Sequence, residues 1–237
     1  MIPKRIICTH VSRSAINASL QRCIERMEAL HPDWEVTFFS DGDCLDFVHR
    51  ECAEYRELYE WYPRAVMKAD FFRILVVWKL GGFYFDSDVW LTQRLDALCR
   101  SRAVFPWEWV MPQSDMAKRY PRHLRGQVEP PQVGNYAFGA TRGHPFLAAI
   151  LEEMVRRTGS FEAEACNDLN VLHATGPDVV TSVYYRDRER WEDVDVLPGD
   201  PTLTGPQPPL SADSPRDWQR FGSYGSHLLA GGWLHGK

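Results

Sequence analysis

The chain has 237 residues, of which 44% are hydrophobic and 13% aromatic, and its formal net charge is −5. This composition can supply a substantial core and excludes a disordered chain, while the negative charge argues against a nucleic-acid-binding surface. The length favours one α/β domain over two small ones.

The six cysteines are irregularly spaced and form no CxxC pair, so we expect reduced packing residues rather than a disulfide framework. The apolar run at the N-terminus is too short for a signal peptide. No segment reaches the roughly 20 apolar residues of a membrane span. These features predict a cytoplasmic protein without a transmembrane segment, and they leave a peripheral contact with a membrane open.

The first third of the chain alternates between strand and helix patterns. In order, the predicted elements are a strand at 5–9, a helix at 14–30, a strand at 35–40, a turn at 41–43, one or two short helices within 44–62, a helix at 65–80 and a strand at 83–85. Gly81 is placed to end the helix at 65–80 in a left-handed cap. The β-α-β-α-β order favours a mostly parallel sheet with helices on its faces.

The rest of the chain is less regular but continues the α/β pattern. The predicted elements are a strand from residue 103, a long surface loop at 111–131, a strand at 135–140, a helix at 144–158, a helix at 177–190 and an irregular segment at 198–215. Pro177 and Asp178 suit the first turn of the last helix. We find no internal repeat and no clean domain boundary.

Two acids, Asp86 and Asp88, follow the strand predicted at residues 83–85. In an open α/β sheet, ligands bind beyond the carboxyl ends of the strands. Spaced one residue apart in an extended chain, the two carboxylates leave on the same face and repel each other. A hard divalent cation, Mg²⁺ or Mn²⁺, resolves the repulsion, and such sites commonly include substrate phosphates. The alternative is that the acids only begin a turn and cap the next element.

Longer motifs surround this pair: "IPKRI", "HPDWEVTFFSD" and above all "AVMKADFFRILVVWKLGGFYFDSDVW", with "GNYAFGATRGHPFL", "HATGPDVVTS" and "GSHLLAGGWL" later. They resemble the DxD-containing retaining glycosyltransferases of the yeast initiating α-mannosyltransferase and α-galactosyltransferase type. The glucosylating domain of large clostridial toxins shares the same central run. The resemblance is specific over residues 1–98 and thinner afterwards.

The resemblance implies a GT-A-like (Rossmann-like) fold, a nucleotide-sugar donor, a divalent metal and transfer with retention of configuration. It implies one domain, residues 1–237, with a donor-binding half at 1–98 and an acceptor-side half with a C-terminal lid at 99–237. By position, it assigns the metal to Asp86, Asp88 and His227, the donor sugar to Asp70, Arg73, Tyr84, Gly81 and Gly82, and an aromatic contact near the nucleotide to Trp233.

Physical arguments support part of this assignment and leave part open. Asp70 and Arg73 share one helix face and can bind sugar hydroxyls, although an exposed ion pair is the alternative. Thr175 and Gly176 can present a helix N-terminus to a diphosphate, or simply start a helix. A neutral imidazole at His227 suits Mn²⁺ better than Mg²⁺, and the glycine-rich tail around it suits a mobile lid.

The predicted function is therefore a metal-dependent retaining glycosyltransferase that uses a nucleotide-sugar donor and a glycan or lipid-linked acceptor. Asp86, Asp88 and Asn135 are the predicted catalytic residues, with Asn135 near the reacting centre. Where relatives carry a Trp after the first strand, this chain has His10. The nucleobase contact thus differs, although a UDP-sugar is favoured over a GDP-sugar. A sugar-nucleotide-binding module and a metal-dependent hydrolase are the alternatives.

Overall fold

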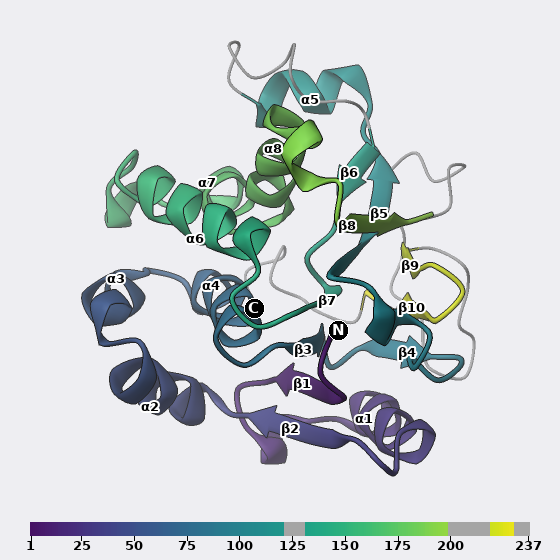
Figure 1. Cartoon of the computed structure of the whole chain (residues 1–237). Helices are drawn as coiled ribbons and strands as arrows, with labels where there is room; N and C mark the ends of the chain where they lie inside the picture. Colours follow the sequence, from purple (N-terminus) through teal and green to yellow (C-terminus); the bar gives the residue numbers. More distant parts are fainter. Residues whose placement is uncertain (121–130, 199–218, 230–237) are drawn as a thin grey trace.

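A computed structural model describes residues 1–120, 131–198 and 219–229. Within these ranges the strands form two sheets, shown in Figure 1. The seven-stranded main sheet, counted over the same residues, has the order β2-β1-β3-β7-β5-β6, with β8 paired to β5. Its strands are β1 (Arg5–Thr9), β2 (Glu35–Phe39), β3 (Gly82–Phe85), β5 (Ala103–Val110), β6 (Pro131–Val133), β7 (Ala137–Ala140) and β8 (Val194–Leu197).

The main sheet contains both parallel and antiparallel strand pairs. Strand β1 is parallel to both β2 and β3, and β5 is parallel to β8. Strand β7 is antiparallel to β3 and β5, and β6 is antiparallel to β5. A smaller antiparallel sheet has the order β4-β10-β9, with β4 at Val89–Leu91, β9 at Gln219–Phe221 and β10 at Gly225–His227. The chain therefore passes from the main sheet to the small one through Asp86, Ser87 and Asp88.

Helices lie on both faces of the main sheet (Figure 1). They are α1 (Ala18–Leu30), α2 (Asp41–Glu51), α3 (Arg56–Trp61), α4 (Ala65–Leu80), α5 (Gln113–Arg119), α6 (Pro145–Thr158), α7 (Asp168–Ala174) and α8 (Pro177–Arg186). The predicted α/β class, a sheet flanked by helices, is confirmed. None of the helices that the structure describes is both long and apolar enough to cross a bilayer.

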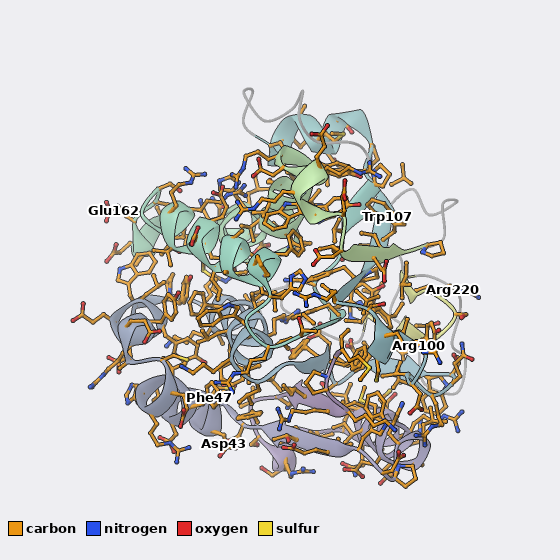
Figure 2. All side chains as sticks on the ribbon, in the orientation of Figure 1. Asp43, Phe47, Arg100, Trp107, Glu162 and Arg220 are labelled. Atoms are coloured by element: carbon orange, nitrogen blue, oxygen red, sulfur yellow. The ribbon has the colours of Figure 1, made fainter. Side chains whose placement is uncertain are left out.

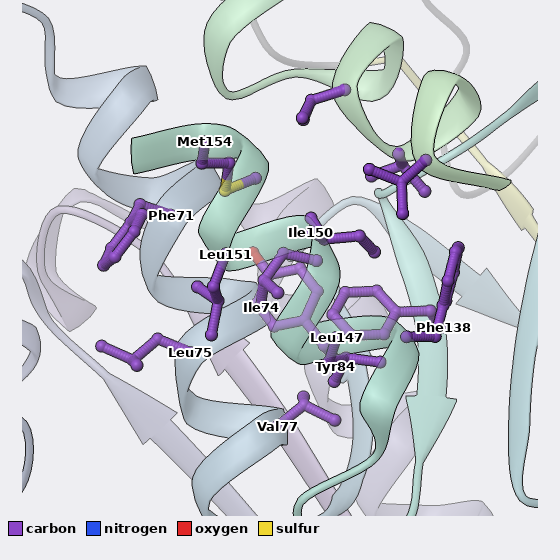
Figure 3. Close-up of a cluster of buried hydrophobic side chains, with 14 of the residues drawn as sticks. Phe71, Ile74, Leu75, Val77, Tyr84, Phe138, Leu147, Ile150, Leu151 and Met154 are labelled. Atoms are coloured by element: carbon purple, nitrogen blue, oxygen red, sulfur yellow. The ribbon is translucent and has the colours of Figure 1, made fainter. Parts of the chain in front are cut away.

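The alternation of side chains along the strands divides the core into two layers. On β3, Tyr84 points toward α4, whereas Phe83 and Phe85 pack on the opposite face. Figure 3 shows Ile74 of α4 and Leu147 of α6 close to the Tyr84 ring. Figure 2 shows side chains filling the space between these helices and the sheet. Helix α4 is thus enclosed on several sides, and this explains why its sequence is apolar around most of its circumference.

Several predicted elements coincide with the structure, and one predicted turn is wrong. Strand β1 and helix α4 have the expected bounds, and β5 begins at the expected residue. The segment Asp41–Asp43 does not form a turn but opens α2. Ser40 caps this helix by accepting from the Asp43 N–H, while the Asp43 carboxylate accepts from the Ser40 N–H. The two acids therefore stabilise a helix start rather than a turn.

The surface loop predicted at residues 111–131 is also wrong in part, because it contains α5 and leads into β6. Arg119 at the end of α5 binds Asp178 through two hydrogen bonds, with Nη2 2.6 Å from Oδ1 and Nε 3.2 Å from Oδ2. Asp178 lies in the first turn of α8, as expected, but it is fully buried. The segment is held by this buried ion pair and by Met116 and Tyr120, which are buried beside it.

Two glycines connect α4 to β3 in conformations that other residues rarely adopt. Gly81 has φ +71° and ψ 170°, so its φ is positive as predicted, but its ψ lies outside the left-handed helical region. Its N–H still caps the helix by donating to the Val77 carbonyl at 2.7 Å. A Cβ on Gly81 would lie 2.9 Å from the Arg142 backbone nitrogen, and a Cβ on Gly82 would lie 2.9 Å from the Arg5 carbonyl oxygen.

We predict that Gly81→Ala destabilises the fold more than Gly143→Ala does. Both glycines have positive φ, +71° and +68°, but a Cβ at Gly143 has no heavy atom within 4 Å. The Gly143 variant should lose about 1 kcal/mol from backbone strain, and the Gly81 variant about 3 kcal/mol because a backbone clash is added. Chemical denaturation of both variants measures this difference. Equal losses would show that the close approach of Arg142 does not constrain the turn.

Candidate active site

Asp86 and Asp88 lie in a tight turn that joins the two sheets. Asp86 follows the last residue of β3, and Asp88 precedes the first residue of β4. The Val89 N–H donates to the Asp86 carbonyl at 3.0 Å, which closes the turn. The expectation of an extended chain across the pair is therefore wrong. A turn brings the two carboxylates together, because the chain must reverse out of the main sheet at this point.

His227 reaches the same place from β10. In the small sheet His227 pairs with Val89, and the neighbouring Leu228 N–H donates to the Asp88 carbonyl at 3.0 Å. The His227 Nε2 lies 3.2 Å from Asp88 Oδ1. One ligand atom from each of Asp86, Asp88 and His227 lies within 4.8 Å of the others. His227 thus belongs to a β-strand and not to a loose tail, while Trp233 lies outside the described residues.

Arg73 is the cation at the centre of the buried part of the site. Its Nη2 lies 3.2 Å from Asp86 Oδ1 and 3.3 Å from Asp70 Oδ1, and its Nη1 donates to the Asn135 carbonyl at 3.1 Å. The guanidinium carbon lies 5.0 Å from the centre of the Tyr84 ring. The Arg73 Nε is buried and makes no hydrogen bond within the described part of the chain. This arrangement leaves one donor of a well-anchored guanidinium for a ligand oxygen.

Asp70 is held by residues from three separate segments. Its Oδ1 accepts from the Asn135 side-chain amide at 3.2 Å, and its Oδ2 accepts from the Thr175 hydroxyl at 3.2 Å. Asp70 is 5% exposed and Arg73 is 7% exposed, so the alternative of an exposed ion pair is wrong. The structure brings Asp70, Arg73, Asn135 and Thr175 together as predicted, although Thr175 meets a carboxylate. Gly176 lies at the junction of α7 and α8, where its N–H donates to the Val171 carbonyl.

Tyr84 is close to the acidic pair, but the two glycines before it are not. The Tyr84 hydroxyl donates to Asp86 Oδ1 at 2.7 Å and lies 2.9 Å from Thr9 Oγ1. This hydrogen bond fixes the orientation of the Asp86 carboxylate. Gly81 precedes β3 and Gly82 is its first residue, whereas Asp86 follows its last residue. The assignment of these glycines to the donor sugar is therefore corrected: they lie at the opposite end of the strand and pack against Pro3, Arg5 and Arg142.

Burial of the acidic side chains shifts the pKa values of the site. Burial raises the pKa of Asp70 to about 7 against the opposing effect of Arg73. Burial also raises the pKa of Asp86, which Arg73 opposes and Asp88 reinforces. Burial alone would lower the pKa of His227, but the Asp88 carboxylate outweighs it and the net shift is upward. The site therefore holds more acidic groups than its own cations balance, and a divalent cation would relieve the excess.

Two further residues of the site were missed by the sequence analysis. Glu108 lies on β5 where the pairing with β6 shifts register between Trp107 and Trp109, an irregularity that redirects a side chain. Tyr136 precedes β7, and its ring stacks on the His227 imidazole with centroids 4.5 Å apart. The lone acid in the aromatic "WEW" stretch was a usable signal for Glu108. No comparable signal marks Tyr136, because its partner lies 91 positions further along the chain.

Comparison with protein families agrees with this geometry. Residues 17–105 match the family described as "Glycosyltransferase sugar-binding region containing DXD motif". This segment contains Asp70, Arg73, Asp86 and Asp88. This part of the chain is similar to the DXD sugar-binding region of glycosyltransferases. The resemblance inferred from the sequence motifs is confirmed.

Individual relatives are also glycosyltransferases. The chain is 26% identical over 173 residues to inositol phosphoceramide mannosyltransferase 3 of Schizosaccharomyces pombe, covering 71% of this chain and 42% of that protein. It is 20% identical to the initiation-specific alpha-1,6-mannosyltransferase of Candida albicans, covering 87% of this chain and 64% of that protein. The chain thus spans less than half the length of the first relative.

A solved structure shares the fold. The PaToxG glycosyltransferase superposes with a TM-score of 0.52 at 16% sequence identity, covering 81% of this chain and 72% of that one. The predicted GT-A-like fold is confirmed, and the comparisons together support a glycosyltransferase.

We predict that Glu108→Gln makes the metal-free protein less sensitive to pH. Burial raises the pKa of Glu108 to about 7, and the Arg119 and His227 charges oppose this shift. Between about pH 4.5 and pH 7 the folded state keeps a proton that the unfolded state has lost, so wild-type stability falls as pH rises. The wild type should lose up to about 3 kcal/mol relative to Glu108→Gln across this window. Urea denaturation at several pH values, with the exposed Glu28→Gln as control, measures it; parallel curves for all three proteins would contradict the prediction.

Proposed function

We propose that the protein is a metal-dependent retaining glycosyltransferase that moves a sugar from a nucleotide-diphosphate sugar to a hydroxyl acceptor. The observation that carries the proposal is the convergence of Asp86, Asp88 and His227 within 4.8 Å of one another. Asp86 and Asp88 lie in the segment 17–105 that matches the DXD sugar-binding region, and His227 joins them from outside it. Two carboxylates and an imidazole are a donor set that fits Mn²⁺, and Mg²⁺ less well. Both acids retain some exposure, 23% for the Asp86 side chain and 9% for Asp88, so a ligand can reach them.

Different residues of the site would bind different parts of the donor. Asp86, Asp88 and His227 would hold the cation. When bound, the cation supplies positive charge to the leaving diphosphate. Arg73 and Asp70 would hold the sugar, because the free Arg73 Nε–H can donate to a hydroxyl oxygen and the Asp70 carboxylate can accept from a hydroxyl. Tyr84 keeps the Asp86 carboxylate in place while these ligands bind.

The retention of configuration is proposed from the family resemblance. We favour attack of the acceptor hydroxyl on the same face of the sugar as the departing diphosphate, with that phosphate taking the acceptor proton. Asn135 would lie beside the reacting centre, because its side-chain amide donates to Asp70 and its backbone carbonyl accepts from Arg73. The names of the yeast relatives point to a mannosyl group and, for the Schizosaccharomyces pombe protein, to an inositol phosphoceramide acceptor. A glycan or lipid-linked acceptor is the corresponding proposal here.

The metal requirement leads to the first test. Binding of UDP and GDP should require Mn²⁺, because Asp86 and Asp88 otherwise repel the diphosphate. Isothermal titration calorimetry with Mn²⁺ and with EDTA measures the requirement. Asp88→Asn should weaken the Mn²⁺-dependent binding by about tenfold or more, since one carboxylate ligand is lost. Asp46→Asn, an exposed acid on α2, is the matched control. Equal nucleotide affinity in Mn²⁺ and EDTA would rule out the metal site.

The assignment of the sugar leads to a second test. Asp70→Asn should weaken binding of an intact UDP- or GDP-sugar by about 10- to 100-fold, the effect of losing a charged hydrogen bond. Free UDP or GDP should be affected little, because Asp70 contacts Arg73, Asn135 and Thr175 and is not one of the proposed metal ligands. Calorimetry with donor and with diphosphate separates the two effects. If both ligands lose the same affinity, Asp70 does not contact the sugar.

A turnover assay with radiolabelled donor separates the proposed activity from its alternatives. Transfer to an added glycan or lipid acceptor supports a transferase, release of free sugar alone supports a hydrolase, and binding without turnover supports a binding module.

A further inference from the structure

We propose that Tyr136 is a positioning residue that fixes the imidazole of His227 at the metal site. This inference rests on the proposed function insofar as it concerns metal binding. Tyr136 lies in the short connection Gly134–Asn135–Tyr136 between β6 and β7. Tyr136 lies outside the segment 17–105 that matches the family. Its role follows from the contacts that this connection makes.

The Tyr136 ring and the His227 imidazole form a nearly parallel stack. Their centroids are 4.5 Å apart and their planes differ by 10°. Tyr136 is 2% exposed, so the ring presents a flat, fixed surface to the imidazole. Its backbone carbonyl accepts from the Asp86 N–H at 2.8 Å. Tyr136 therefore contacts two of the three candidate metal ligands: Asp86 through its backbone carbonyl and His227 through its ring.

The ring and not the hydroxyl makes this contact. The Tyr136 hydroxyl is buried and makes no hydrogen bond within the described residues. The side chain is retained in this position by packing, so a phenyl ring should serve as well.

The chain makes room for this ring by placing glycine beside it. A Cβ on Gly134 would lie 2.8 Å from Tyr136 Cε1 and 3.2 Å from the Cβ of Glu108. Both distances are shorter than ordinary contacts between such atoms, so a side chain at residue 134 would push Tyr136 away from His227. The backbone of Gly134 is not in the positive-φ region that favours glycine, so its small size is what the site requires.

The stack matters because an imidazole at a strand end can rotate about its side-chain bonds. Metal affinity depends on a ligand that already points at the site, and groups that orient a ligating histidine typically change metal affinity by about 10- to 100-fold. The flat Tyr136 ring restricts His227 to orientations in which Nε2 stays beside Asp88, 3.2 Å from Oδ1. The preceding residue, Asn135, restrains Asp70 and Arg73 by hydrogen bonds, through its side-chain amide and its backbone carbonyl. The connection thus orients the metal-facing and the sugar-facing groups together.

The first experiment tests the stack in the metal-free protein. In protein labelled at histidine, the His227 ring resonances are identified by their loss in His227→Gln. Tyr136→Leu should abolish the upfield ring-current shift of these resonances, and Tyr136→Phe should retain it. The control is Phe105→Leu, which removes a comparable buried stack on Phe138, with centroids 4.9 Å apart and planes at 8°, away from the metal ligands. Unchanged His227 resonances in Tyr136→Leu would overturn the inference whatever the enzyme's activity.

The second experiment measures Mn²⁺ binding by the intensity of the free-ion signal in electron paramagnetic resonance. Tyr136→Leu should bind Mn²⁺ about tenfold more weakly than wild type, whereas Tyr136→Phe and Phe105→Leu should stay within about twofold. Equal losses in Tyr136→Leu and Phe105→Leu would show a general effect of core destabilisation and overturn the inference. If the wild type binds no Mn²⁺, the proposed metal-dependent function fails, and the resonance experiment still decides whether Tyr136 holds His227.

Discussion

The site depends on one buried cation, the guanidinium of Arg73. Two carboxylates, Asp70 and Asp86, are withdrawn from water beside it, and removing a charge from water costs several kcal/mol unless a partner compensates. Arg73 supplies that compensation from the middle of α4, a helix enclosed by the core. Because the guanidinium is planar and also rests on the Tyr84 ring, it holds both acids in fixed directions. Lysine could neutralise the charge but could not make the same set of directed contacts.

Around this cation, the topology decides which residues can meet. The parallel pairing of β1 with β3 places Thr9 beside Tyr84, and the antiparallel pairing of β7 with β3 places Asn135 and Tyr136 beside Asp86. The chain then turns through Asp86 and Asp88 into the small sheet, and β10 pairs with β4 in the register that sets His227 opposite Val89. The proposed metal ligands therefore come from the boundary between two sheets, and the residues proposed to bind the sugar come from the boundary between the main sheet and α4.

The sequence predicted the parts of this arrangement that are local. The bounds of β1 and α4, the start of β5 and the placement of Asp70 and Arg73 on one face of α4 all follow from spacing within a few residues. The turn at the acidic pair, helix α5 and the strand that carries His227 did not follow, because each is stabilised by segments far away in the chain. Asn135 and Thr175 lie 65 and 105 positions from Asp70, the carboxylate they hold. Tyr136 could not be predicted for the same reason, because its partner His227 lies on β10, far along the chain.

Charge, more than shape, explains what this site should accept. Asp70, Asp86, Asp88 and Glu108 place four acidic groups close to two bases, Arg73 and His227, while the nearby Arg119 is committed to Asp178. Burial raises the pKa of Asp70, Asp86 and Glu108, with a smaller contribution from neighbouring acids, so the surroundings disfavour the charged forms of these carboxyls. A bare diphosphate would add to the excess and would be repelled. A diphosphate that arrives with a divalent cation brings the compensating charge itself, so the same acids that exclude the free anion attract the complex. In the proposed function, selection of the metal-bound donor is thus a direct consequence of burying more carboxylates than the protein neutralises.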